Sequence, residues 1–294
     1  MRTIFRDPIH QKTFDEDGYV VVPFFDAEQI SKLTNLYDSI YDESQSGKSG
    51  YHSLFNMDDK EQVANANELI QNVHRDGLQE LLIDYKILVS SFSIKEPKTE
   101  DYLPLHMDWS IVDETKHISM GTWSPLIDVD LKNGNFAVLK GSHQFGYTIR
   151  GSRVCFIYSD EPYPSILGAI KDKYEIECVE MKAGDILFFD HRLAHFSTPN
   201  FSDEVRVAAA TMLIPEEAQS IHYHVLDDES IEVFETVESF YMSHELNTKP
   251  TIGIKSIGVA RRDTGAGLQE QMNDSLSIEI PGLEQGSDTA LSQH

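Results

Sequence analysis

The sequence has few cysteines and few basic residues. Its 294 residues contain two cysteines, Cys155 and Cys178, which are too few for a disulfide framework, so we expect a reducing compartment. Only 24 Lys and Arg stand against 49 Asp and Glu, giving a net charge of −25. Nucleic acid is therefore excluded as a partner, because binding it requires a basic face. The same charge argues more weakly against coenzyme-A thioesters, since a local basic pocket can exist on an acidic protein.

Long apolar runs are also missing. No run approaches the roughly 20 residues that a membrane span requires, and the first residues lack the apolar stretch of a signal peptide. We expect a cytoplasmic protein with no membrane partner, and the sequence leaves its oligomeric state open. With 40% hydrophobic residues and no internal repeat, residues 1–262 are expected to form a single domain. Residues 263–294, rich in Gly, Ser, Gln and Asp, are expected to be a flexible tail.

The pattern of apolar residues indicates helices outside a β-rich core. A helix is expected after Asp26, whose side chain can form a capping box with Gln29, and a second over residues 63–83. Strands dominate residues 85–215, and another helix is expected over 227–241. The irregular stretch 145–174 is long enough to shape a substrate pocket. Its Arg150 and Arg153 are candidate substrate-binding residues, with solvated side chains as the alternative.

Three residues, His106, Asp108 and His195, are the most informative feature of the chain. Two imidazoles and one carboxylate can occupy one face of an Fe(II) ion and leave other coordination positions open. The run 86–94 reads as a strand, and Pro97 and Pro104 make a helix there unfavourable. On a strand, residues two apart share one face, so His106 and Asp108 are expected to reach one metal ion.

Two other histidine patterns compete with this interpretation. His74 and Asp76 repeat the His-x-Asp spacing but lie in a stretch of helical period, where residues two apart point to different sides. His191 and His195 are four apart, as in zinc-binding helices. However, residues 186–189 read as a buried strand, which does not give helical geometry. The pattern therefore favours His195 as the ligand and His191 as a structural residue or one near the mouth of the site.

Three residues near these ligands are candidates for binding anions or substrate. Arg206, eleven residues after His195, opens a β-rich run and is either a carboxylate-binding group or a solvated edge residue. Lys95 either helps to place an anionic cosubstrate or extends from its strand to solvent. Trp109, which follows Asp108, either faces the substrate or packs in the core.

Taken together, these segments resemble the phytanoyl-CoA dioxygenase family of Fe(II)- and 2-oxoglutarate-dependent oxygenases over roughly residues 12–215. The chain differs from the common pattern before Gly141, where the family often has a proline. The matching segments are 15–24, 105–109, Trp123, 133–135, 139–143, 184–189, His195–Ser197 and Arg206.

The resemblance implies a mainly β fold with flanking helices, built on a double-stranded β-helix (a cupin-like jelly roll). It implies Fe(II) held by His106, Asp108 and His195. It also implies 2-oxoglutarate held by Arg206, Ser197 and Trp123. The implied reaction consumes O2 and 2-oxoglutarate, hydroxylates an unactivated C–H bond and releases succinate and CO2. An amino acid or a specialised metabolite is the expected small-molecule substrate.

Several alternatives remain at this stage. The Asp108 ligand leaves no vacant position for chloride and favours hydroxylation over halogenation, but desaturation or ring formation stays possible. The same chemistry on a peptide or carrier-bound substrate is the second hypothesis. A cupin-type metalloenzyme that does not use 2-oxoglutarate would share the fold but have no need of Arg206 and Ser197. The last alternative is a non-catalytic barrel that binds a ligand.

Overall fold

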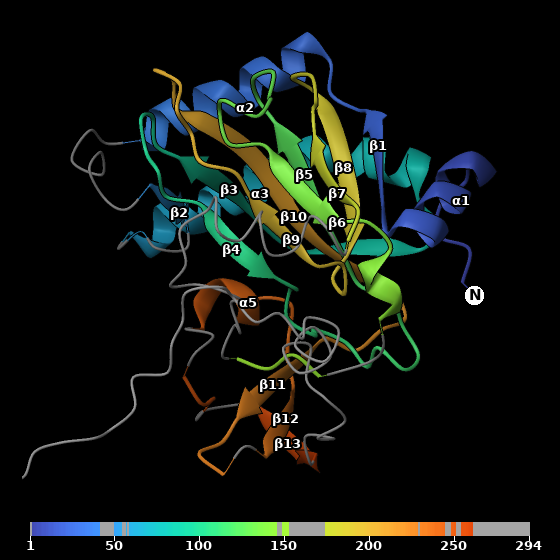
Figure 1. Cartoon of the computed structure of the whole chain (residues 1–294). Helices are drawn as coiled ribbons and strands as arrows, with labels where there is room; N and C mark the ends of the chain where they lie inside the picture. The colour runs from blue at the N-terminus through green and yellow to red at the C-terminus, as the bar shows by residue number, and fades with distance from the viewer. Residues whose placement is uncertain are drawn as a thin grey trace, which may run out of the picture.

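The computed structural model describes residues 2–41, 50–54, 57, 59–145, 149–152, 174–228, 230–244, 248–250 and 254–260. These residues form a mainly β fold with flanking helices, as expected (Figure 1). The helical elements are α1 (Pro8–Asp17), α2 (Ala27–Ile40), α3 (Lys60–Leu81), η3 (Ser142–Gln144) and α5 (Phe240–Ser243). The strands are β1 (Tyr19–Pro23), β2 (Tyr51–Ser53), β3 (Tyr85–Lys95), β4 (Leu103–His106), β5 (Met120–Pro125), β6 (Phe136–Leu139), β7 (Ile176–Val179), β8 (Asp185–Asp190), β9 (His195–Ser197), β10 (Arg206–Pro215), β11 (Ile221–Val225), β12 (Ile231–Glu235) and β13 (Lys255–Ala260).

Two antiparallel sheets form the core. One has the strand order β1-β8-β5-β10-β3-β2 and the other the order β4-β9-β6-β7. A single buried cluster joins them: Trp123 and Leu187 of the first sheet pack with Phe136 and Val138 of the second. Because strands distant in sequence alternate within each sheet, this is the jelly-roll arrangement that the sequence predicts.

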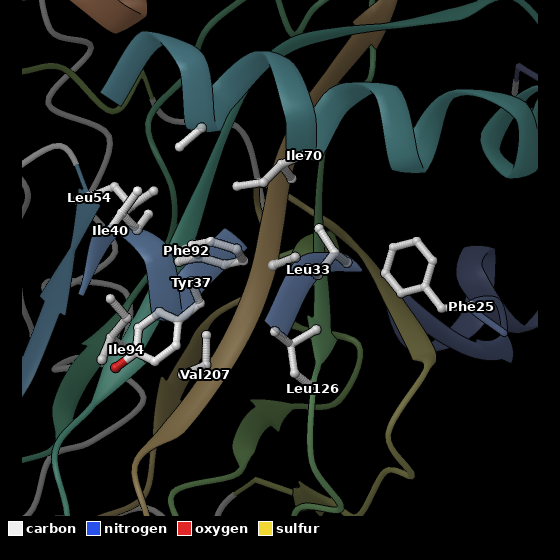
Figure 2. Close-up of a cluster of buried hydrophobic side chains, with 12 residues drawn as sticks. Phe25, Leu33, Tyr37, Ile40, Leu54, Ile70, Phe92, Ile94, Leu126 and Val207 are labelled. Atoms are coloured by element: carbon white, nitrogen blue, oxygen red, sulfur yellow. The ribbon is translucent and has the colours of Figure 1, made fainter. Parts of the chain in front are cut away.

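The outer face of the six-stranded sheet is covered by helices. Asp26 caps α2 through the predicted capping box with Gln29, and Asp59 caps α3, which begins three residues before the predicted helix 63–83. Figure 2 shows side chains of α2 and α3, among them Leu33 and Ile70, packed against Phe92 of β3.

Alternation along β3 and β10 decides which side chains enter the space between the sheets. Phe92 and Val207 face the helices, whereas Lys95 and Arg206 face inward, toward Ser197 and Trp123 respectively. Because both faces of this sheet are covered, even its polar inward side chains are shielded from water. The fold thereby places two cationic side chains in its interior.

The prediction of a helix over residues 227–241 is wrong. Strand β12 occupies Ile231–Glu235, and only the four residues Phe240–Ser243 are helical, as α5. Asp228 accepts hydrogen bonds from the backbone N–H and the hydroxyl of Ser230, and this turn folds β12 back against β11. Pairing with β11 on one side and β13 on the other satisfies the backbone of β12, so partner strands override the helical spacing. Figure 1 shows this three-stranded sheet beside the two larger ones.

Some predictions concern residues outside the described part of the chain. These are the flexible tail 263–294, Arg153, and most of the stretch 145–174. The single domain 1–262 stays a prediction. Among the described helices, none combines the length and the apolar character that crossing a membrane requires.

His74, the histidine of the competing triplet, is part of the helix–sheet core. It lies on α3, is 0% exposed, and donates from Nδ1 to the carbonyl of Ile70. Burial lowers its pKa to about 4. Because a folded-state pKa below that of the unfolded chain means that the unfolded state binds the proton first, stability falls as the pH drops from 6.5 toward 4.

We expect His74→Phe to reduce this loss of stability. From pH 7 to pH 5 the free energy of unfolding of the native protein should fall by about 2 kcal/mol more than that of the variant. The reason is that the imidazole of His74 takes up a proton when the native chain unfolds at pH 5. Urea unfolding at both pH values measures the difference, and metal binding should be unchanged. Equal pH slopes for the two proteins would show that His74 keeps an ordinary pKa.

Candidate active site

Strand pairing brings the two predicted histidine ligands together. His106 ends β4, His195 begins β9, and the two residues are direct partners across this antiparallel pair. Their ring centroids are 4.2 Å apart, and Phe136 stacks on the His195 ring. Nδ1 of His106 donates to the carbonyl of Pro104, and Nδ1 of His195 donates to that of Leu193. These bonds place the proton on Nδ1 and leave the lone pair on Nε2, the form in which an imidazole binds a metal.

The Asp108 side chain also approaches the two histidines, but from a loop and not from the strand that the sequence predicted. Strand β4 ends at His106, so Asp108 lies in the loop that follows and does not share a strand face with that histidine. Arg150 holds the loop by donating from Nε to the Asp108 carbonyl at 2.6 Å. Oδ1 of Asp108 then lies 3.7 Å from Nε2 of His106 and 3.9 Å from Nε2 of His195.

These three side chains fit a metal ion. One ligand atom from each lies within 4.8 Å of the other two, and no other such group exists among the described residues. With metal–ligand bonds of about 2.1 Å, two ligand atoms are at most about 4.2 Å apart, which the two distances to Oδ1 satisfy. Burial lowers the pKa of His106 and of His195 to about 4, so both imidazoles are neutral and able to coordinate at neutral pH. The predicted His-Asp-His triad is present.

His191 is excluded from this group but adjacent to it. It is 0% exposed, and its Nε2 lies 3.8 Å from Oδ2 of Asp108. The connection after β8 is not helical, so the zinc-type helical pair with His195 does not form.

The predicted anion-binding arginine is buried against Trp123. Arg206 is 1% exposed, and its guanidinium lies 5.1 Å from the centroid of the Trp123 ring. Its NH1 group donates to the carbonyl and hydroxyl of Ser93, whereas its Nε is buried without a hydrogen-bond partner in the described structure. Burial lowers the pKa of Arg206 to about 10, which still leaves the guanidinium charged at pH 7.

A second buried basic side chain lies directly opposite Arg206. Lys95 of β3 is its cross-strand partner and is 0% exposed. Its Nζ donates to the Ser197 hydroxyl at 2.6 Å and to the Thr198 carbonyl. Burial and the neighbouring Arg206 hold the pKa of Lys95 well below its usual range. The printed partners of Lys95 and Arg206 are hydroxyl and carbonyl oxygens, and within the described chain neither side chain forms an ion pair with a carboxylate. Two like charges facing each other across paired strands are unfavourable, which favours the neutral form of Lys95. A carboxylate bound between the two side chains would favour the charged form of Lys95 and offset this repulsion.

Ser197 and Tyr51 are polar residues next to Lys95 and Arg206. The Ser197 oxygen accepts from Lys95 and from the backbone N–H of Leu103, so its own proton remains for donation. The Tyr51 hydroxyl hydrogen-bonds Ser93 and is within electrostatic reach of both Arg206 and Asp108. Sequence reasoning missed Tyr51, because it opens a three-residue strand and belongs to no motif.

The candidate substrate residues have different surroundings. Arg150, besides holding the Asp108 loop, forms an ion pair with the buried Glu114. Trp109 is only partly buried, and its Nε1 has no partner within the described residues. It lines a small cavity together with His222 and Tyr241, on the side of the three-stranded sheet. Arg153 lies outside the described residues.

A jelly roll that brings two histidines and one aspartate to a single point is typical of non-haem iron oxygenases. Residues 14–208 of this chain match the phytanoyl-CoA dioxygenase (PhyH) family. The match covers more than half of the chain, which therefore belongs to that family of Fe(II)- and 2-oxoglutarate-dependent oxygenases. The resemblance predicted from the sequence is confirmed. No curated protein sequence matches the chain.

Solved structures show the same fold. SnoK, described as a non-haem α-ketoglutarate-dependent carbocyclase from nogalamycin biosynthesis, is 18% identical, with a TM-score of 0.54 over 73% of this chain and 86% of its own. HygX from Streptomyces hygroscopicus, solved with nickel and 2-oxoglutarate bound, is 14% identical, with a TM-score of 0.51 over 72% of this chain and 88% of its own. The epimerase SnoN, in complex with Fe3+, α-ketoglutarate and nogalamycin RO, is 15% identical, with a TM-score of 0.50 over 87% of this chain and 94% of its own.

Proposed function

We propose that this protein is a hydroxylase that uses Fe(II), O2 and 2-oxoglutarate to oxidise an unactivated C–H bond of a small molecule. The proposal rests on two features that lie together inside the jelly roll. The first is the His106–Asp108–His195 triad. The second is the pair of buried basic side chains Lys95 and Arg206, which have no carboxylate partner among the described residues. Lys95 donates to Ser197, which lies two residues after His195 on β9. Neither a metal-free barrel nor a cupin that ignores 2-oxoglutarate would need the second feature.

Each residue has a distinct part in the proposed reaction. His106, Asp108 and His195 hold Fe(II), which when bound supplies the oxidative chemistry that amino-acid side chains lack. Arg206 receives the far carboxylate of 2-oxoglutarate on its planar guanidinium, with Trp123 fixing the guanidinium from one side. The bound carboxylate favours the charged form of Lys95, which donates to it from Nζ, and Ser197 donates its remaining proton to the same carboxylate. These groups orient the cosubstrate before O2 arrives.

Succinate formation tests the proposal most directly. The metal-free protein is supplied with Fe(II), ascorbate and 2-oxoglutarate, and succinate is measured with and without panels of amino acids and specialised metabolites. A compound that accelerates succinate release and gains one oxygen atom identifies the substrate class. If 2-oxoglutarate is neither bound nor consumed under any of these conditions, the proposed function is wrong.

Product identification must accompany the succinate assay. SnoK is described as a carbocyclase and SnoN as an epimerase, and both share this fold. Since the three metal ligands are compatible with more than one outcome, mass spectrometry of the product separates hydroxylation from ring closure or desaturation. A peptide or carrier-bound substrate is the second candidate, tested by the same assay.

Lys95→Met should weaken 2-oxoglutarate binding at least tenfold, because a charge-assisted hydrogen bond is worth roughly 1.5 to 3 kcal/mol. Thermal stabilisation of the metal-free protein by 2-oxoglutarate measures the effect. Lys86→Met is the matched control: it removes another lysine of β3, whose partner is Glu238 at 3.5 Å on the surface. Equal stabilisation of both variants would mean that Lys95 does not contact the cosubstrate.

A further inference from the structure

His191 is a buried imidazole next to the site, and the roles assigned so far leave it unused. It is 0% exposed, and neither of its ring nitrogens has a hydrogen-bond partner within the described structure. Its backbone is fixed, since its N–H donates to the carbonyl of Ser119 at 3.2 Å. Leaving a polar group buried and unpaired is costly, so an imidazole at this position calls for a partner when the site is complete.

The carboxylate of Asp108 is the candidate partner of His191. The two carboxylate oxygens of Asp108 face different groups: Oδ1 lies 3.7 Å from Nε2 of His106, whereas Oδ2 lies 3.8 Å from Nε2 of His191. One oxygen is thus turned toward the metal position and the other toward His191.

We propose that His191 positions the carboxylate ligand, by donating a hydrogen bond from Nε2–H to Oδ2 of Asp108 so that Oδ1 alone is presented to the metal. This inference rests on the proposed function, since it assigns Asp108 to the metal. His191 is a positioning residue, because it acts through Asp108 and does not itself bind the ion.

The geometry requires only a small adjustment. Shortening 3.8 Å to an ordinary hydrogen-bond distance of about 2.9 Å needs a movement of roughly 1 Å. Meanwhile Arg150 holds the backbone carbonyl of Asp108 at 2.6 Å. Asp108 lies beyond the end of β4, so strand pairing does not fix its orientation. Hydrogen bonds to its backbone carbonyl and to Oδ2 fix it instead. Groups that fix metal ligands in this way contribute about 10- to 100-fold to metal affinity.

Two substitutions separate hydrogen bonding from packing. His191→Phe keeps a planar ring but removes the donor, and His191→Gln keeps an N–H group near the position of Nε2. Metal-free protein is titrated with Co(II) alone, and binding is followed by visible absorption. The dissociation constant should rise about 10- to 100-fold for the Phe variant and return to within about threefold of the native value for the Gln variant.

His74→Phe is the matched control, because it replaces another fully buried imidazole, on α3, with the same ring. It should bind Co(II) as the native protein does. Native affinity in His191→Phe, or equally weak binding by both His191 variants, would overturn the positioning role and leave the proposed function standing. If the native protein itself binds no Co(II), the proposed function fails first.

Discussion

We expect Asp108→Ala to abolish substrate-dependent succinate formation and to weaken metal binding more than about 100-fold. This is the largest effect that the structure predicts, because the substitution removes one of the three side chains that converge on the metal position among the described residues. The loss should exceed what removing a partner of a ligand costs, about 10- to 100-fold in metal affinity. Both quantities are measured on the same protein, by Co(II) titration and by succinate release.

Asp76→Ala is the control for this experiment. It removes the carboxylate of the other His-x-Asp triplet, which is exposed on α3, and should leave metal binding and turnover at native levels. Turnover retained in Asp108→Ala would remove Asp108 from the ligand set and with it the triad.

Arg206→Gln should weaken 2-oxoglutarate binding by about 2 to 5 kcal/mol, which is roughly thirtyfold or more. The reason is that one carboxylate of the cosubstrate would be buried beside a neutral amide in place of the guanidinium that rests on Trp123. The apparent affinity for 2-oxoglutarate measures this loss, while Co(II) affinity should stay native because Arg206 is not a metal ligand.

Arg206→Lys gives an intermediate result. It keeps the positive charge but loses the planar pair of donors, so affinity should lie between the native and Gln values. An unchanged 2-oxoglutarate affinity in both variants would mean that another cation, foremost Lys95, anchors the cosubstrate. The Asp108 and Arg206 variants thus separate the metal end of the site from its carboxylate-binding end.

The sequence predicted the parts of the fold whose signals are local. The capping box of Asp26 and Gln29 starts α2 where predicted, and the apolar runs form β3, β8 and β10. It also set aside His74 correctly, because the helical period of α3 directs His74 and Asp76 to different sides.

Two predictions failed where non-local contacts decide. The expected helix 227–241 is mostly strand β12, which pairs with β11 and β13. Asp108 was expected on a strand and lies in a loop, so its approach to His106 depends on contacts with Arg150. Pairing partners and tertiary hydrogen bonds outweigh local periodicity in both cases, and a single sequence does not carry them in its spacing.

By itself, the sequence determined the kinds of ligand, two imidazoles and a carboxylate, and their order along the chain of a jelly-roll protein. Only the tertiary structure decided that Lys95 and Arg206 face each other across paired strands, and that His191 faces the second oxygen of Asp108. The physical reason is that side-chain type and period are local properties of a chain. Which charges become neighbours, and which polar atoms are left without partners, is fixed when distant strands pair and exclude water.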